Sequence, residues 1–80
     1  MRYRLVHDDG RVEVFEYGTP ARYYTKQEGL ARVDWLVAEV GEHDFTWTMH
    51  YASTSNHGFE GVQFWFKRQE DFVRFSMFWS

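Results

Sequence analysis

Two runs of alternating apolar and polar residues flank a short turn near the N-terminus. Residues 3–7 and 12–17 are rich in β-branched and aromatic side chains, and the turn between them contains Asp9-Gly10. An Asp-Gly pair between such runs is typical of a two-residue β-hairpin turn, in which both central residues need a positive φ. The pattern therefore predicts a hairpin in which Leu5 pairs with Val14.

The next stretch, residues 26–40, repeats its apolar residues at helical spacing. Thr25 and Glu28 stand at its start in the capping-box arrangement, which satisfies the free amides of a helix N-terminus. Gly41 follows as the helix end. We expect the single apolar stripe of this helix to face the core. Its members are Leu30, Val33, Leu36, Val37 and Val40.

The C-terminal half predicts two more strands and a second helix. Residues 45–51 and 62–67 show the alternation of half-buried strands, and residues 53–61 form a polar connection. Glu70 and Asp71 suit the positive end of a terminal helix. The element order ββαββα predicts a single α+β domain, residues 1–80, in which two helices pack on one face of a four-stranded, mainly antiparallel sheet.

The opposite face of this sheet would be open to solvent. In the predicted hairpin register, three large aromatic residues stand on that face beside two arginines. The candidate open-face site consists of Arg2, Arg4, Phe15, Tyr17, His50 and Trp65. Its rings could stack the bases of a single-stranded nucleic acid, or a second copy of the chain could cover them in a homodimer.

Trp35 lies roughly opposite the apolar stripe of the predicted helix, so we expect an outward-facing ring. Carboxylates surround it, because the 34 residues from Val33 to Phe66 contain five Asp or Glu and no Lys or Arg. Exposed tryptophan is common in interface hot spots, although Trp35 could instead pack sideways against residues 18–25 or 53–61. The candidate partner-binding patch consists of Glu28, Asp34, Trp35, Glu39, Glu42 and Asp44.

Composition narrows the class of protein. The net charge is −3, and there is no cysteine, which excludes disulfides and thiolate zinc sites. Aromatic residues make up 21% of the chain and can supply the core of so small a domain. No apolar run approaches the ~18 residues of a membrane-spanning helix, and the N-terminus shows no secretory signal. We therefore expect no membrane association.

The histidines give little support for a metal or catalytic site. His43, His50 and His57 recur every seven residues, but this repeat crosses a strand and a loop and puts them on no common face. The hydroxyl residues 53–55 near His57 lack the strand–turn–helix setting of an activated nucleophile. We expect no metal, no cofactor and no enzyme activity. Two acid–histidine pairs stay open as a general acid and base: Glu42 with His43, and His50 with Glu60.

Direct nucleic-acid binding is the runner-up hypothesis. The open face offers aromatic rings and arginines, but the chain has no aromatic-glycine motif of the RNA-recognition type and no glycine-rich phosphate loop. Its net charge is also negative, whereas nucleic-acid-binding modules are usually basic. A protein partner is therefore the leading expectation.

The last strand and helix resemble the endings of small phage-encoded proteins. Residues 62–79 read VQFWFKRQEDFVRFSMFW, in which an aromatic-x-Phe-Lys strand precedes an acidic helix start, spaced Phe residues and a closing Trp. Size, absence of cysteine and the acidic tract are similar to phage inhibitors of bacterial immunity, including anti-CRISPR proteins. That group has no shared motif, so no functional residue is carried over. The resemblance implies a non-enzymatic inhibitor in the bacterial cytoplasm that binds a host effector complex at a basic, nucleic-acid-binding surface.

Overall fold

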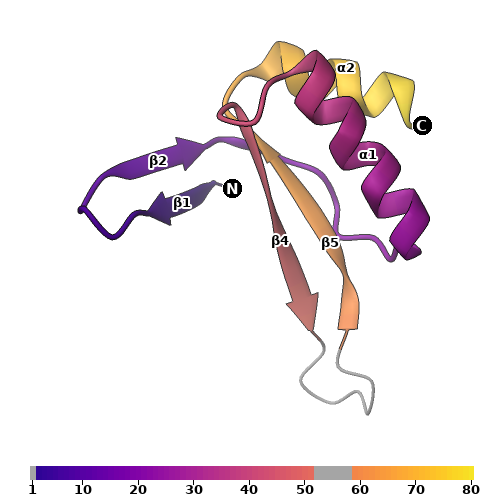
Figure 1. Ribbon diagram of the computed structural model, residues 1–80, viewed down its shortest axis with the longest axis horizontal. Coiled ribbons are helices and arrows are strands. Elements are labelled where there is room, and N and C mark those ends of the chain that lie inside the picture. Colours follow the sequence, from indigo (N-terminus) through magenta and orange to yellow (C-terminus); the bar gives the residue numbers. More distant parts are fainter. Residues whose placement is uncertain (1, 52–58) are drawn as a thin grey trace.

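The computed structural model describes residues 2–51 and 59–80 as an α+β fold with two helices and two antiparallel sheets (Figure 1). The strands are β1 (Tyr3–Val6), β2 (Val12–Phe15), β3 (Tyr17–Gly18), β4 (Phe45–Tyr51) and β5 (Phe59–Phe66), and the helices are α1 (Lys26–Glu39) and α2 (Gln69–Phe78). Strands β1 and β2 form one sheet, and the other sheet has the order β3-β5-β4. The predicted single four-stranded sheet and its element order are therefore wrong.

The chain changes its partner strand at Glu16, which separates β2 from β3. Strand β2 pairs with β1, but β3 pairs with the central strand β5 and places Gly18 opposite Trp65. The predicted strand 12–17 is thus two short strands in different sheets. A bend of this kind makes a corner between two packed sheets. Two short strands on either side of such a bend have the same alternating sequence pattern as one straight strand, so the pattern alone did not show the bend.

The β1–β2 hairpin forms as predicted, but its turn is one residue longer. The His7 N–H donates to the Arg11 carbonyl at 2.8 Å, and the Gly10 N–H donates to the His7 carbonyl at 3.0 Å. Residues 8–10 therefore form the loop, with Gly10 at a φ of 89°. A three-residue loop with glycine in the left-handed region is a common hairpin connection, so the same Asp-Gly signal fits two turn lengths.

The longer turn shifts the hairpin register by one residue. Tyr3 lies opposite Phe15, and Leu5 lies opposite Glu13 instead of the predicted Val14. Because side chains alternate between faces, this shift moves every β2 side chain to the other face relative to β1. Phe15 consequently points toward the rest of the molecule and is buried, whereas Val14 is exposed.

Helix α1 begins with the predicted capping box. The Glu28 N–H donates to Thr25 Oγ1 at 3.2 Å, and the Thr25 N–H donates to Glu28 Oε1 at 2.9 Å. The helix ends at Glu39, with Val40 as its C-cap. The location of this helix is therefore confirmed, because both of its ends are encoded locally.

The buried face of α1 is rotated from the predicted stripe. Leu36 and Val40 are buried, but Leu30 is 54% exposed and Val37 is 49% exposed. This corresponds to a turn of roughly 50° about the helix axis, toward the side that carries Trp35. The prediction that the whole stripe faces the core is wrong for Leu30 and Val37.

Contacts with α2 and the residue after it explain the rotation of α1. The Arg32 guanidinium lies between the rings of Tyr24 and Trp79, at 4.4 Å from each ring centre. Such cation–π contacts favour a defined placement of both rings. Farther along α1, Glu39 forms an ion pair with Arg74 of α2. Arg32 and Glu39 thus face α2 and the residue after it. This orientation of α1 directs Leu30 and Val37 away from the core.

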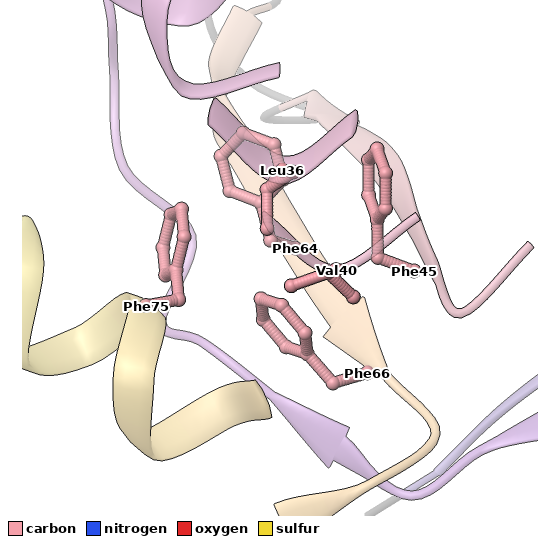
Figure 2. Packing of buried hydrophobic residues seen from close by; sticks show 6 residues of the cluster. All are labelled: Leu36, Val40, Phe45, Phe64, Phe66 and Phe75. Atoms are coloured by element: carbon pink, nitrogen blue, oxygen red, sulfur yellow. The ribbon is translucent and has the colours of Figure 1, made fainter. Parts of the chain in front are cut away.

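Six residues form the hydrophobic core between the helices and the β4–β5 pair, and Figure 2 shows their side chains converging. They are Leu36, Val40, Phe45, Phe64, Phe66 and Phe75. Four of the six are phenylalanine, which agrees with the expectation that aromatic residues supply the core of a small domain.

Helix α2 begins next to a buried carboxylate. Asp71 is buried, and it accepts a hydrogen bond from Arg68 Nε at 2.9 Å. Its negative charge also lies in the first turn of the helix, where the helix dipole stabilises it. The terminal helix predicted from Glu70 and Asp71 is therefore confirmed. Across the described ranges, neither helix has the length and apolar character needed to cross a membrane.

Candidate binding surfaces

The carboxylates of the predicted acidic patch lie in different surroundings. Glu28 lies at the start of α1, and its carboxylate is held in the capping box. The hydrogen bond from the Thr25 backbone lowers the pKa of Glu28. Asp34 is exposed farther along the helix and makes no ion pair with any side chain in the described ranges. Glu28 therefore stabilises the start of α1, whereas the Asp34 carboxylate is available to a partner.

Trp35 does not point straight outward as predicted. Its ring stacks on Phe78 at 5.1 Å between centres and meets the edge of Phe75 at 6.1 Å. The ring is half-buried because α2 packs on this side of α1. The alternative prediction, packing against residues 18–25 or 53–61, also missed this contact with α2, although residues 52–58 lie outside the described ranges.

The remaining acidic residues lie close to arginines or at the turn after α1. Glu39 Oε1 lies 3.2 Å from Arg74 Nη2. Asp44 Oδ2 lies 3.4 Å from Arg68 Nη2. Glu42 is exposed and has His43 at 3.7 Å as its neighbour. Two carboxylates of the predicted patch are thus partly neutralised by α2 and its flank.

The predicted open face is covered by the β1–β2 hairpin. Phe15 is 1% exposed and Trp65 is 4% exposed. Tyr3 of β1 stacks on the Trp65 ring, with 5.7 Å between ring centres. Tyr17 is partly buried and packs against Phe72. The expectation of exposed aromatic rings is wrong for Phe15 and Trp65, and a base-stacking platform would need those rings in solvent.

The polar members of the predicted open-face site lie in two different settings. The Trp65 Nε1–H donates to Thr48 Oγ1 at 3.1 Å, and Thr48 Oγ1 lies 3.1 Å from His50 Nε2. His50 therefore joins a chain of hydrogen bonds with Thr48 and Trp65. Arg2 and Arg4 are exposed at the start of the chain. The structure thus separates the arginines from the rings that were expected to stack with bases.

A cluster of charged side chains links the hairpin to Lys67, the residue that follows β5. Glu13 accepts a hydrogen bond from Lys67 Nζ, and its other oxygen lies 2.5 Å from His7 Nε2. Lys67 also lies over the ring of Phe15, 5.3 Å from its centre. The hydrogen bonds from Lys67 and then His7 lower the pKa of Glu13 to about 2. The cluster holds the hairpin in place over Trp65, so its role in the structure is positional.

The described residues contain no group of three or more histidines, carboxylates or cysteines that could hold a metal ion. His43 is exposed beside Glu42, whereas His50 is bonded to Thr48. His57 and the hydroxyl residues 53–55 lie outside the described ranges. Of the two proposed acid–histidine pairs, Glu42 and His43 lie 3.7 Å apart in solvent, and the Glu60 side chain of the other pair lies outside the described part of the structure.

An apolar groove of about 390 Å³ lies between α1 and the β4–β5 pair. Its walls come from α1, from both strands and from the segment that precedes α1. We call this feature the apolar groove; its described lining residues are Tyr23, Tyr24, Thr25, Lys26, Gly29, Leu30, Val33, Trp47, Met49, Val62 and Phe64. Trp47 is 47% exposed there, although its β4 neighbour Phe45 is buried in the core.

A second exposed apolar surface lies on the opposite side of α1, at the end of α2. Met77 is 73% exposed and Phe78 is 62% exposed. Together with Trp35, Glu39 and Arg74 they line a shallow depression of about 430 Å³. We call this the Trp35–Phe78 surface. Large contiguous apolar patches on a monomer often mark interaction sites.

The sequence contained one signal for these two surfaces that the single-stripe interpretation missed. Apolar residues on α1 spread from Leu30 and Val37 around to Trp35, which is wider than the stripe of about 100° that one contact face requires. A helix with so wide an apolar sector contacts more than one neighbour or leaves part of the sector exposed. Here Trp35 contacts α2, and Leu30 lines the apolar groove.

Comparison with known proteins gives no relative from which a role could be transferred. No protein-family model, curated protein or solved structure matches the chain.

Proposed function

We propose that this chain is a non-enzymatic binding protein that contacts a protein partner through the Trp35–Phe78 surface. Met77 and Phe78 carry the proposal, because they are 73% and 62% exposed at the end of a well-formed helix. Interface cores are enriched in aromatic residues and methionine, and a few such residues supply most of the binding energy. The Phe78 ring stacks on Trp35, so it is already positioned before a partner arrives.

Charged groups at the edge of the Trp35–Phe78 surface favour a basic partner. Asp34 is exposed in the middle of α1, Glu42 is exposed just after its end, and the chain carries a net charge of −3. Carboxylates at the rim of an interface steer a positively charged partner and fix its orientation. The pairs of Glu39 with Arg74 and Asp44 with Arg68 reduce this acidic field. We therefore assign the binding energy to the apolar residues and the steering to the rim.

The resemblance in residues 62–79 supplies the biological setting of the proposal. It implies an inhibitor of a bacterial immune effector that covers a basic, nucleic-acid-binding surface in the host cytoplasm. Phe78 and Met77 lie within this segment, so the resemblance and the exposed surface concern the same helix. Blocking such a surface requires contact area and complementary charge and needs no catalytic group.

Replacing Phe78 with serine tests the proposed surface. The partner is first captured from host lysate and identified by mass spectrometry, and its affinity is then measured with purified proteins. We expect Phe78→Ser to weaken binding by about tenfold or more, as for an interface hot spot. Met77→Ser should weaken it to a smaller extent. Higher salt should weaken the wild-type complex as well, because the rim charges are screened.

Val6→Ser is the matched control for Phe78→Ser. Val6 is 63% exposed on the outer face of the hairpin, so this variant removes an exposed apolar residue from a different surface. It should bind the partner with wild-type affinity. Full affinity in Phe78→Ser, with equal unfolding curves for all variants, would contradict the proposed surface. Failure of the wild-type protein to displace nucleic acid from the captured partner would contradict the inhibitory role.

A further inference from the structure

The apolar groove differs from the Trp35–Phe78 surface in shape and in charge. Helix α1 and the β4–β5 pair enclose it from two sides, whereas the Trp35–Phe78 surface is shallow. Phe45 of β4 is buried beneath the helices, but Trp47 and Met49 continue beyond that cover and are about half exposed. Trp47 and Met49 therefore lie in a row along β4 in the groove, and the described residues leave both of them about half exposed.

One end of the apolar groove is polar and positively charged. Thr25 and Lys26 line this end, at the start of α1. None of the described lining residues is a carboxylate, and Lys26 makes no ion pair with any side chain in the described ranges. This is the opposite of the chain as a whole, which is acidic. An anionic group at this end would find a cation that is not already neutralised.

We propose that the apolar groove binds a small amphipathic molecule with an apolar body and one anionic group. The volume of about 390 Å³ lies in the range of small-molecule sites, which are mainly apolar and have a few polar groups that fix orientation. The apolar body lies against Leu30, Val33 and Trp47, and the anion lies at Lys26. The site is independent of the partner surface at Phe78, because α1 separates the two.

Octanoate is a suitable probe because it combines an eight-carbon chain with a single carboxylate. We expect its titration, followed by two-dimensional amide NMR, to shift the signals of groove residues and the indole N–H of Trp47 in a saturable manner. Hexanoate should bind about tenfold more weakly, since two fewer CH₂ groups are buried. Octyltrimethylammonium has the same apolar chain and the opposite charge, so it should bind more weakly than octanoate.

Two groove variants and one control on the same helix identify the contributing residues. Lys26→Gln should weaken octanoate binding about threefold, as expected for an exposed ion pair, and should remove the preference over octyltrimethylammonium. Leu30→Gln should weaken binding of both probes. Val37→Gln is the control, because Val37 has a similar exposure on α1 but does not line the groove.

Three outcomes would overturn the proposal. The first is that octanoate produces no saturable shifts at the groove residues. The second is that octanoate and octyltrimethylammonium bind the wild-type protein equally well, or that Lys26→Gln keeps the wild-type affinity. The third is that Val37→Gln and Leu30→Gln have the same effect. None of these results bears on the Trp35–Phe78 surface, which is tested with a protein partner.

Discussion

The two faces of the β3-β5-β4 sheet are covered to different degrees. On one face, the hairpin buries Trp65, whose ring stacks on Tyr3 at 5.7 Å. On the other face, the helices bury Phe64, but Trp47 stays 47% exposed. The sequence predicts the reverse arrangement, with an open face at Trp65 and a covered face at Trp47. A hairpin of two four-residue strands therefore buries a tryptophan on one sheet face, whereas the two longer helices leave a tryptophan half exposed on the other.

The largest expected effect comes from replacing one tryptophan on each face. Trp65→Ala should lower the free energy of unfolding by about 3–5 kcal/mol, because it removes a fully packed ring and leaves a cavity under the hairpin. Trp47→Ala should cost only about 1–2 kcal/mol, since nearly half of that residue is in solvent. Urea denaturation of both variants measures the difference. Equal decreases in unfolding free energy for the two variants would contradict the conclusion that the hairpin covers its sheet face more completely than the helices cover theirs.

The elements that could be predicted from the sequence are those whose signals are local. The capping box of Thr25 and Glu28 and the Asp9-Gly10 turn depend on residues a few positions apart, so the helix and the hairpin were predicted at the right places. The partition into two sheets could not be predicted in this way. It depends on the bend at Glu16 and on contacts between Tyr3 and Trp65, which are far apart in the sequence.

The candidate sites were predicted less well than the elements. Trp35 was expected to face outward, but it contacts Phe78, and this contact depends on where α2 packs. The Phe15 ring was expected in solvent because the one-residue change in hairpin register cannot be read from an Asp-Gly pair alone. The Trp65 ring was expected there because the sequence does not show that the hairpin is a separate sheet whose Tyr3 stacks on it. The binding role of the acidic patch stays a prediction; Asp34 and Glu42 are its exposed carboxylates that neither cap a helix nor pair with an arginine in the described ranges.

A glycine under the hairpin-covered face gives a sharper test of how closely that face is packed. A Cβ added at Gly18 would lie 2.6 Å from Cζ3 of the Trp65 ring, so the ring would have to move. Gly18→Ala should therefore destabilise the protein by about 1–3 kcal/mol, as overpacked residues do. Gly29→Ala in α1 is the control, because a Cβ there meets nothing within 4 Å.

The control should change stability in the opposite direction. Replacing a glycine inside a helix with alanine reduces the entropy lost on folding, so Gly29→Ala should stabilise the protein by about 0.5–1 kcal/mol. Thermal and urea unfolding of both variants measure whether each substitution raises or lowers the free energy of unfolding. A neutral Gly18→Ala would show that Trp65 has room to move, and the hairpin would then cover the sheet less tightly than the contact indicates.

The smallest expected effect concerns the charges that fasten the hairpin to the sheet. Hydrogen bonds from Lys67 and His7 lower the pKa of Glu13 from 4.5 to about 2. A carboxyl group with a lower pKa in the folded state stabilises that state above its ordinary pKa, and the contribution is lost as the pH falls through the folded value. Glu13 should therefore stabilise the protein fully above about pH 4.5 and lose this effect toward pH 2.

Glu13→Gln isolates this contribution. The urea midpoint of the variant should lie below that of the wild type at pH 6, and the difference should shrink steadily between pH 4.5 and pH 2. Asp9 and Glu28 also have a lowered pKa, but they are common to both proteins and cancel in the difference. Glu16→Gln is the control: Glu16 is exposed at the bend and makes no ion pair within the described ranges, so its midpoint should match the wild type at each pH. A difference between Glu13→Gln and the wild type that stays constant with pH would mean that packing alone, without the Glu13 charge, holds the hairpin over Trp65.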